Sequence, residues 1–164
     1  MNAKTNLKIL PTRDNHNCFG CSPVNPSGLH MRFHTDGEAL YSWLTVSSQF
    51  CGWNDFVHGG VITTILDEVM GWSAIYLLKT LTLTKSITVN FLKPIHTNDE
   101  LRAEGRISRR DGEREVLMEG LLYNSKETLC SKAYGTFATF PPDVAAKFGL
   151  DPSVLEGLKR LLST

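Results

Sequence analysis

The stretch HGGVITTILDEVMGW, His58 to Trp72, decides how the rest of the chain is interpreted. It opens with a His-Gly-Gly turn, and the apolar run after it continues to Leu78 with only two charged side chains, Asp67 and Glu68. A helix that lacks a polar face is expected to be surrounded by the rest of the protein. Because an unpaired buried carboxylate costs several kcal/mol, each acid needs a partner or a function.

The two acids point to different sides of this helix. At about 100° per residue, Asp67 shares its stripe with small side chains, which leave room for a substrate or a second subunit. These neighbours are Thr63, Thr64, Gly71 and Ala74. Glu68 lies on a bulkier stripe beside Trp72. We therefore favour a functional role for Asp67, whereas the sequence alone does not explain Glu68.

The glycines at the start of the helix indicate a place where an oxyanion could bind. A helix N-terminus presents unpaired N–H groups, and glycines let a ligand oxygen approach them closely. Gly59 and Asp67 are about 12 Å apart along one helix, which is too far to hold one carbonyl group. Antiparallel helices in a two-fold dimer would remove this obstacle. His58 alone is more often structural than catalytic.

Length and charge exclude several classes of protein. A chain of 164 residues fits one domain, and 17 basic residues balance 17 acidic ones. No positive field therefore favours nucleic acid or an anionic membrane surface as a partner. The run from Val61 to Leu78 is nearly long enough to span a bilayer, but its acids lie near the midpoint, so no membrane association is expected. The N-terminus does not have the pattern of a signal peptide, which predicts a cytoplasmic protein.

Alternating apolar and polar residues predict strands on both sides of the helix. The expected strands are 29–34, 39–47, 81–94, 100–109, 113–124 and 128–140. The first two are expected to form a hairpin. This order predicts an α+β fold in which a curved antiparallel sheet of about six strands wraps around one long central helix.

The chain divides into three segments. Residues 1–17 are polar and aperiodic, and we expect an arm that packs loosely or not at all. Residues 18–140 form the domain. Residues 141–164 contain proline at the start and again after Asp151, and they predict one or two short helices outside the sheet.

The cysteine pair of the CFGC sequence, Cys18 and Cys21, resembles half of a zinc site. A structural zinc needs two more ligands, and no second Cys-x-x-Cys occurs. His16, His30 or Cys51 could in principle complete a site. An ordinary loop turn is the favoured interpretation, so no metal or other cofactor is predicted.

Three stretches together resemble a known family. CFGCSPVNPSGLHMRF, the His-Gly-Gly helix, and SITVNFLKPIHTNDELRAEGRI followed by SKAYGTFATF are similar to the hotdog-fold thioesterases, most closely the PaaI-like acyl-CoA thioesterases. The resemblance runs from about Cys18 to Phe140. It implies a dimer with a continuous sheet, or a tetramer of such dimers, that hydrolyses an acyl-CoA thioester.

The resemblance also implies roles for particular residues. Asp67 corresponds to the family's acid, as general base or nucleophile, and the Gly59 N–H corresponds to the oxyanion donor. His58 forms the turn, Gly60 permits close approach, and Thr84 matches the side chain that positions water. Asn54, Ser86 and Glu68 are the candidate substrate-binding residues. Asn54 stands at an unusual offset from the His-Gly-Gly turn, because Gly52 occupies the usual place of the family's amide.

Two alternatives to hydrolysis remain open at this stage. The chain could be a non-catalytic hotdog module that binds an acyl-CoA, since fold does not fix chemistry. It could instead hydrate or dehydrate an acyl thioester, although the His and Asp arrangement associated with that reaction does not stand out here.

Overall fold

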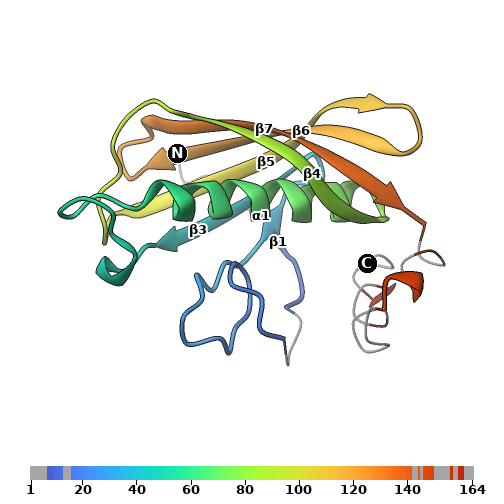
Figure 1. The fold of residues 1–164 in the computed structure, drawn as a ribbon, viewed down its shortest axis with the longest axis horizontal. Coiled ribbons are helices and arrows are strands. Elements are labelled where there is room, and N and C mark those ends of the chain that lie inside the picture. Colours follow the sequence, from blue (N-terminus) through green and yellow to red (C-terminus); the bar gives the residue numbers. More distant parts are fainter. Residues whose placement is uncertain are drawn as a thin grey trace.

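The structure of the protein is a computed structural model, which describes residues 7–12, 16–141, 144, 146–149, 156, 159 and 160. One long helix packs against a curved antiparallel sheet (Figure 1). The helix is α1 (Gly59–Leu78), and the strands are β1 (Lys8–Ile9), β2 (His34–Thr35), β3 (Ala39–Thr45), β4 (Leu81–Phe91), β5 (Glu100–Asp111), β6 (Glu115–Asn124) and β7 (Leu129–Phe140). The predicted architecture is therefore confirmed.

The order of the strands places β4 at one edge of the sheet. The sheet runs β1-β2-β3-β5-β6-β7-β4, and all neighbouring strands are antiparallel. β4 follows α1 directly in the chain and pairs with β7. Among the described residues, no strand pairs with the other side of β4, so β4 is an open edge of the sheet. The start of α1 lies at the same rim (Figure 1).

The helix begins and ends where its sequence predicts. His58 is the N-cap, and Lys79 ends the helix in the left-handed conformation with φ of 54°. By length and composition α1 could cross a membrane, with a mean hydropathy of 1.4. A buried core helix satisfies the same criteria, and half of this one is buried inside the protein.

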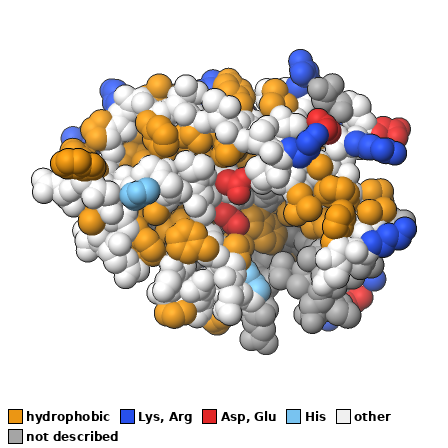
Figure 2. Space-filling view, in the orientation of Figure 1, with side chains coloured by type: hydrophobic (Ala, Val, Ile, Leu, Met, Phe, Trp, Pro, Cys, Tyr) orange, Lys and Arg blue, Asp and Glu red, His pale blue; other side chains and the backbone are white. Residues whose placement is uncertain are grey.

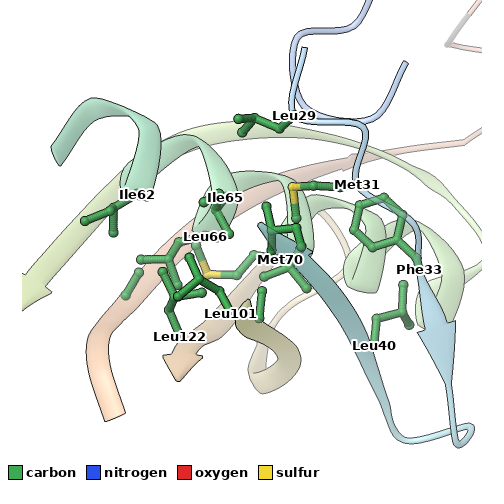
Figure 3. Close-up of a cluster of buried hydrophobic side chains, with 14 of the residues drawn as sticks. Leu29, Met31, Phe33, Leu40, Ile62, Ile65, Leu66, Met70, Leu101 and Leu122 are labelled. Carbon is green, nitrogen blue, oxygen red and sulfur yellow. The ribbon is translucent and has the colours of Figure 1, made fainter. Parts of the chain in front are cut away.

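The core lies between α1 and the concave face of the sheet. Ile65, Leu66 and Met70 of α1 are completely buried and face Leu101 of β5 and Leu122 of β6 (Figure 3). Burial of each such side chain stabilises the fold by roughly 1.5–3 kcal/mol before entropy is counted.

The segment 29–33 covers α1 from the side away from the sheet. Leu29, Met31 and Phe33 alternate as predicted and are all buried (Figure 3). The prediction of a strand over 29–34 is nevertheless wrong, because only His34–Thr35 pairs with β3. The backbone N–H groups of Leu29 and Met31 donate instead to the carbonyls of Phe19 and Gly20, at 2.8 and 2.9 Å.

The two ends of the chain differ from expectation in different ways. Part of the predicted loose arm is ordered structure, because Lys8–Ile9 adds a strand beside β2 and Leu10 is only 3% exposed. This explains why the sheet has seven strands. Most of 141–164, where one or two helices were predicted, lies outside the described residues. The part that the structure describes includes the short 3-10 helix η2 (Ala146–Phe148).

Candidate functional site

The N-terminus of α1 has one backbone N–H that the fold leaves unused. His58 caps the helix, and its Nδ1 accepts a hydrogen bond from the Gly60 N–H at 2.9 Å. The N–H groups of Val61 and Ile62 donate to the His58 carbonyl at 2.9 and 3.1 Å. Among the described residues, the N–H of Gly59 has no acceptor. Gly59 is thus the available donor, while Gly60 is engaged by the cap.

A cleft of about 680 Å³ opens beside this N–H group. The loop before α1, the first turn of the helix and the segment that follows β4 form its walls. Apolar side chains dominate the lining: Gly52, Trp53, Phe56, Val57, His58, Gly59, Ile62, Phe91, Leu92, Lys93, Pro94 and Ile95. The volume is sufficient for a small-molecule group, and the orphan donor lies in its wall.

Asp67 lies two turns farther along α1 and is held by β4. The Oγ1 of Thr84 donates a hydrogen bond to Oδ1 of Asp67 at 2.8 Å. A β-bulge between Thr84 and Ser86 shifts the register of β4 against β7 at this point. Thr84 is opposite the buried Phe137, which packs on α1, so Thr84 faces the helix. Thr84, which the resemblance implies as the side chain that positions water, therefore lies beside Asp67.

The acid and the donor do not share one cleft within a single chain. Asp67 is absent from the lining of the cleft at Gly59, and eight residues of helix separate the two. At 1.5 Å of rise per residue this is about 12 Å. If both act on one carbonyl group, one of them must come from another copy of the chain.

Glu68 points away from Asp67 and lies against the N-terminal loop. The thiol of Cys18 donates to its Oε1 at 3.2 Å, and its Oε2 is buried without a partner among the described residues. Burial is the main cause that raises the pKa of Glu68, to about 8. The pKa of Cys18 is lowered mainly by its hydrogen bond with Cys21. The placement of Glu68 gives no support to its predicted role in substrate binding.

The remaining predicted binding residues lie at the surface away from the acid. Asn54 is exposed and has φ of 53°, which places it at a turn between Trp53 and Phe56. Asn tolerates this left-handed conformation, so the turn itself explains the residue. Ser86 is exposed and pairs with Thr136, on the opposite face of the sheet from Thr84.

Aromatic residues divide between the cleft and the core. Trp53 and Phe56 line the cleft, and Trp53 is 87% exposed. Trp72 stacks on Phe33 instead, with ring centroids 5.4 Å apart. The segment from Phe91 to Ile95 was not predicted as a cleft wall, because most of it was expected to continue the strand 81–94, whereas β4 ends at Phe91.

Part of the chain matches a known family. Residues 54–131 match the family model described as the thioesterase superfamily. No curated protein matches the chain. The match includes the turn, α1, β4 and β5, so it covers the candidate site.

Several solved structures share the fold at low sequence identity. The PaaI protein of E. coli, from the phenylacetic acid degradation operon, is 18% identical, with a TM-score of 0.61 over 68% of this chain and 80% of that one. Protein smu.793 of Streptococcus mutans, bound to acetyl CoA, is 18% identical, with a TM-score of 0.60 over 86% of this chain and 94% of that one. A further thioesterase superfamily protein is 22% identical, with a TM-score of 0.64. The matched region is 70% of this chain and spans 56% of that protein's length.

Proposed function

We propose that the chain, whose residues 54–131 match the thioesterase superfamily, hydrolyses an acyl-CoA thioester to a free acid and CoA at a site shared by two protomers. The observation that carries the proposal is the hydrogen bond from Thr84 Oγ1 to Asp67 Oδ1. It holds one carboxylate oxygen, and Oδ2 has no hydrogen-bond partner among the described residues, so this oxygen can accept a proton from water.

The cleft at the start of α1 supplies the second component. A thioester carbonyl placed there would accept a hydrogen bond from the Gly59 N–H, whose donor is otherwise unused among the described residues. This donor is fixed by the helix and does not need to reorganise as negative charge develops on the carbonyl oxygen. The positive end of the helix dipole favours the same charge.

A dimer through β4 would bring the two components together. β4 is an open edge eleven residues long, and exposed edges of this kind can pair with a second copy. The apolar residues Leu83, Phe91 and Leu92 on and after this strand are 49%, 55% and 54% exposed. Figure 2 shows hydrophobic side chains gathered on the face that carries α1 and β4, with acidic side chains near its centre. In a two-fold dimer the partner's Asp67 would face Gly59.

The reaction then follows from these positions. Asp67 takes a proton from water, and the water oxygen attacks the carbonyl carbon while the Gly59 N–H of the other protomer stabilises the oxyanion. The carbon–sulfur bond breaks, and the CoA thiolate leaves and recovers the proton. Asp67 could instead attack the carbonyl itself, and water would then hydrolyse the resulting anhydride. The acetyl CoA bound to the Streptococcus mutans relative supports an acyl-CoA ligand of this kind.

A hydrolysis screen tests the proposal. Free thiol release is measured with aromatic, short, medium and long acyl-CoAs. Asp67→Asn is expected to lower kcat by at least ~100-fold while the protein remains folded. Asp99→Asn, away from the cleft and from Thr84, is the matched control. Full activity of Asp67→Asn would overturn the assignment, and acyl-CoA binding without turnover across the panel would favour the non-catalytic binding module.

A further inference from the structure

Three side chains that could bind a metal meet beneath the N-terminal loop. Cys18 and Cys21 belong to this loop, and Glu68 reaches them from α1, 50 residues later in the chain than Cys18. Their two sulfur atoms and one carboxylate oxygen all lie within 4.8 Å of one another. The site proposed for thioester hydrolysis uses none of these groups.

The loop holds Cys18 against the carboxylate of the helix. The Cys18 thiol donates to Oε1 of Glu68 at 3.2 Å. The Ser22 N–H donates to the Cys18 carbonyl at 3.2 Å and closes the turn. This fixed turn keeps the Cys18 sulfur beside Glu68, and loss of the thiol proton would give the thiolate, which is the form that coordinates a metal.

Glu68 has a buried acceptor that nothing in the described fold satisfies. Its Oε2 has no hydrogen-bond partner there, and a Cβ added at Gly20 would lie 2.2 Å from Glu68 Cγ. The loop is therefore packed directly on this side chain. A buried carboxylate without a partner is costly, so this position needs a compensating group.

We propose that Cys18, Cys21 and Glu68 bind a zinc ion, with water or His16 as the fourth ligand. Two thiolates and a carboxylate match the ligand preference of zinc, which is tetrahedral. A tetrahedral ion with zinc–sulfur bonds of about 2.3 Å places its two sulfurs about 3.8 Å apart, which is compatible with ligand atoms that lie within 4.8 Å of one another. The ring of His16 lies beside Cys18, whose N–H is 3.4 Å from its Nδ1.

The position of the site in the fold defines what the ion does. It joins the loop that covers α1 to the helix itself, at the residue next to Asp67. Zinc therefore stabilises the loop and fixes the helix turn that carries the proposed catalytic acid. This inference does not depend on the hydrolytic activity, because it rests on contacts on the other side of α1.

Cobalt titration of the full chain provides the test. Reduced protein is stripped with a chelator and titrated with Co²⁺, whose visible spectrum reports tetrahedral geometry and whose near-ultraviolet bands report thiolate ligands. One Co²⁺ per chain with both features is expected, together with displacement by Zn²⁺ and a rise in Tm with Zn²⁺. Cys18→Ser and Cys21→Ser are expected to weaken binding by more than ~100-fold. Glu68→Gln is expected to weaken it and change the visible bands.

Two further variants complete the design. Cys51→Ser removes an exposed cysteine outside the cluster and is expected to bind Co²⁺ as the parent does. His16→Ala weakens binding if His16 is the fourth ligand and leaves it unchanged if water is. Circular dichroism checks that each variant folds. If a cysteine variant does not fold, the thiolate bands of the parent and the Glu68→Gln spectrum decide the question.

The proposal is overturned by any of three results. The first is an absence of thiolate bands in the parent protein. The second is equal Co²⁺ affinity in folded Cys21→Ser and parent protein, which would indicate adventitious binding. The third is a disulfide between Cys18 and Cys21 in the purified protein, together with no metal binding after this disulfide has been reduced.

Discussion

The hydroxyl of Thr84 donates to the carboxylate of Asp67 across the gap between β4 and α1, at 2.8 Å. This bond connects an edge strand to the central helix at the one stripe of α1 that is lined by small residues. It restricts the rotation of the carboxylate and thereby sets the direction of its second oxygen. Thr84 is therefore a positioning residue, and its effect should appear through Asp67.

Replacing Thr84 tests this relationship. Thr84→Val keeps the shape of the side chain but removes the donor, and we expect kcat to fall by roughly 10- to 100-fold, the value of a hydrogen bond to a charged group. Thr84→Ser retains the hydroxyl and should retain most of the activity. KM should change little in both. A Thr84→Val enzyme with unchanged kcat would show that the bond has no catalytic consequence.

Removal of the Gly59 N–H tests the oxyanion donor without adding a large side chain. Gly59 is the first residue of α1, where proline is tolerated, and His58 before it has φ of −59° and ψ of 135°, a conformation compatible with a following proline. Gly59→Pro should lower kcat by ~100- to 1000-fold. Gly59→Ala keeps the N–H and places its Cβ 3.5 Å from the Phe91 ring, so it should lose far less. Equal losses in the two variants would indicate steric exclusion instead.

The sequence predicts the elements whose signal is local. The bounds of α1 follow from its cap and its apolar run, and β4 to β7 follow from alternation and short turns. Alternation in 29–33 correctly identifies the buried side chains, but it carries no information about which backbone groups pair. Loop residues satisfy the backbone of 29–33, so the expected hairpin forms only at its end, where His34–Thr35 pairs with β3.

The functional residues also differ in whether a local sequence signal identifies them. His58, Gly59 and Asp67 lie within one short motif and Thr84 in the next element, so the sequence could single them out, and the structure brings Thr84 to Asp67. The contact of Glu68 with Cys18 spans 50 residues and has no local signal. The cleft wall from Phe91 to Ile95 depends on how β4 ends beside the helix, which only the folded chain reveals.

His58 is expected to contribute to stability through its cap. Its ring accepts the Gly60 N–H, and loss of an N-cap costs about 1 kcal/mol. His58→Ala should therefore lower the free energy of unfolding in urea by about this amount at a fixed protein concentration. His58→Asn offers a carbonyl oxygen at the same place and should restore stability. A His58→Ala protein that is as stable as the parent but inactive would indicate a catalytic histidine instead.

The ion pairs of the buried Glu119 with two partly exposed cations should make stability depend on pH. Burial raises the pKa of Glu119, but Lys132 and Arg106, at 2.7 and 2.5 Å, outweigh it and lower the pKa to about 2. The unfolded chain, with a value near 4.5, binds the proton first as pH falls. The contribution of Glu119 to the free energy of unfolding is therefore fully present above pH ~5 and is lost as the pH falls toward ~2.

Chemical denaturation across this pH range measures the effect. Glu119→Gln should be less stable than the parent at neutral pH but should lose less further stability between pH ~5 and ~2. Glu38→Gln, at an exposed position, is the control and should follow the parent. Parallel pH curves for Glu119→Gln and the parent would contradict the assigned role of the ion pairs.

Mixing two inactive variants tests whether the site is shared between protomers. In a dimer of Asp67→Asn with Gly59→Pro, one site combines both mutations and the other combines the intact Gly59 of one chain with the intact Asp67 of its partner. Random assembly of equal amounts should recover about a quarter of the parent activity. Asp67→Asn mixed with Thr84→Val provides the control, because both changes affect the same half of each site. The activity of this mixture should not exceed the average of the two separate variants. If differently tagged heterodimers form and the first mixture gains nothing, Gly59 and Asp67 do not meet across a dimer interface, and the separation of about 12 Å along α1 must be overcome in another way.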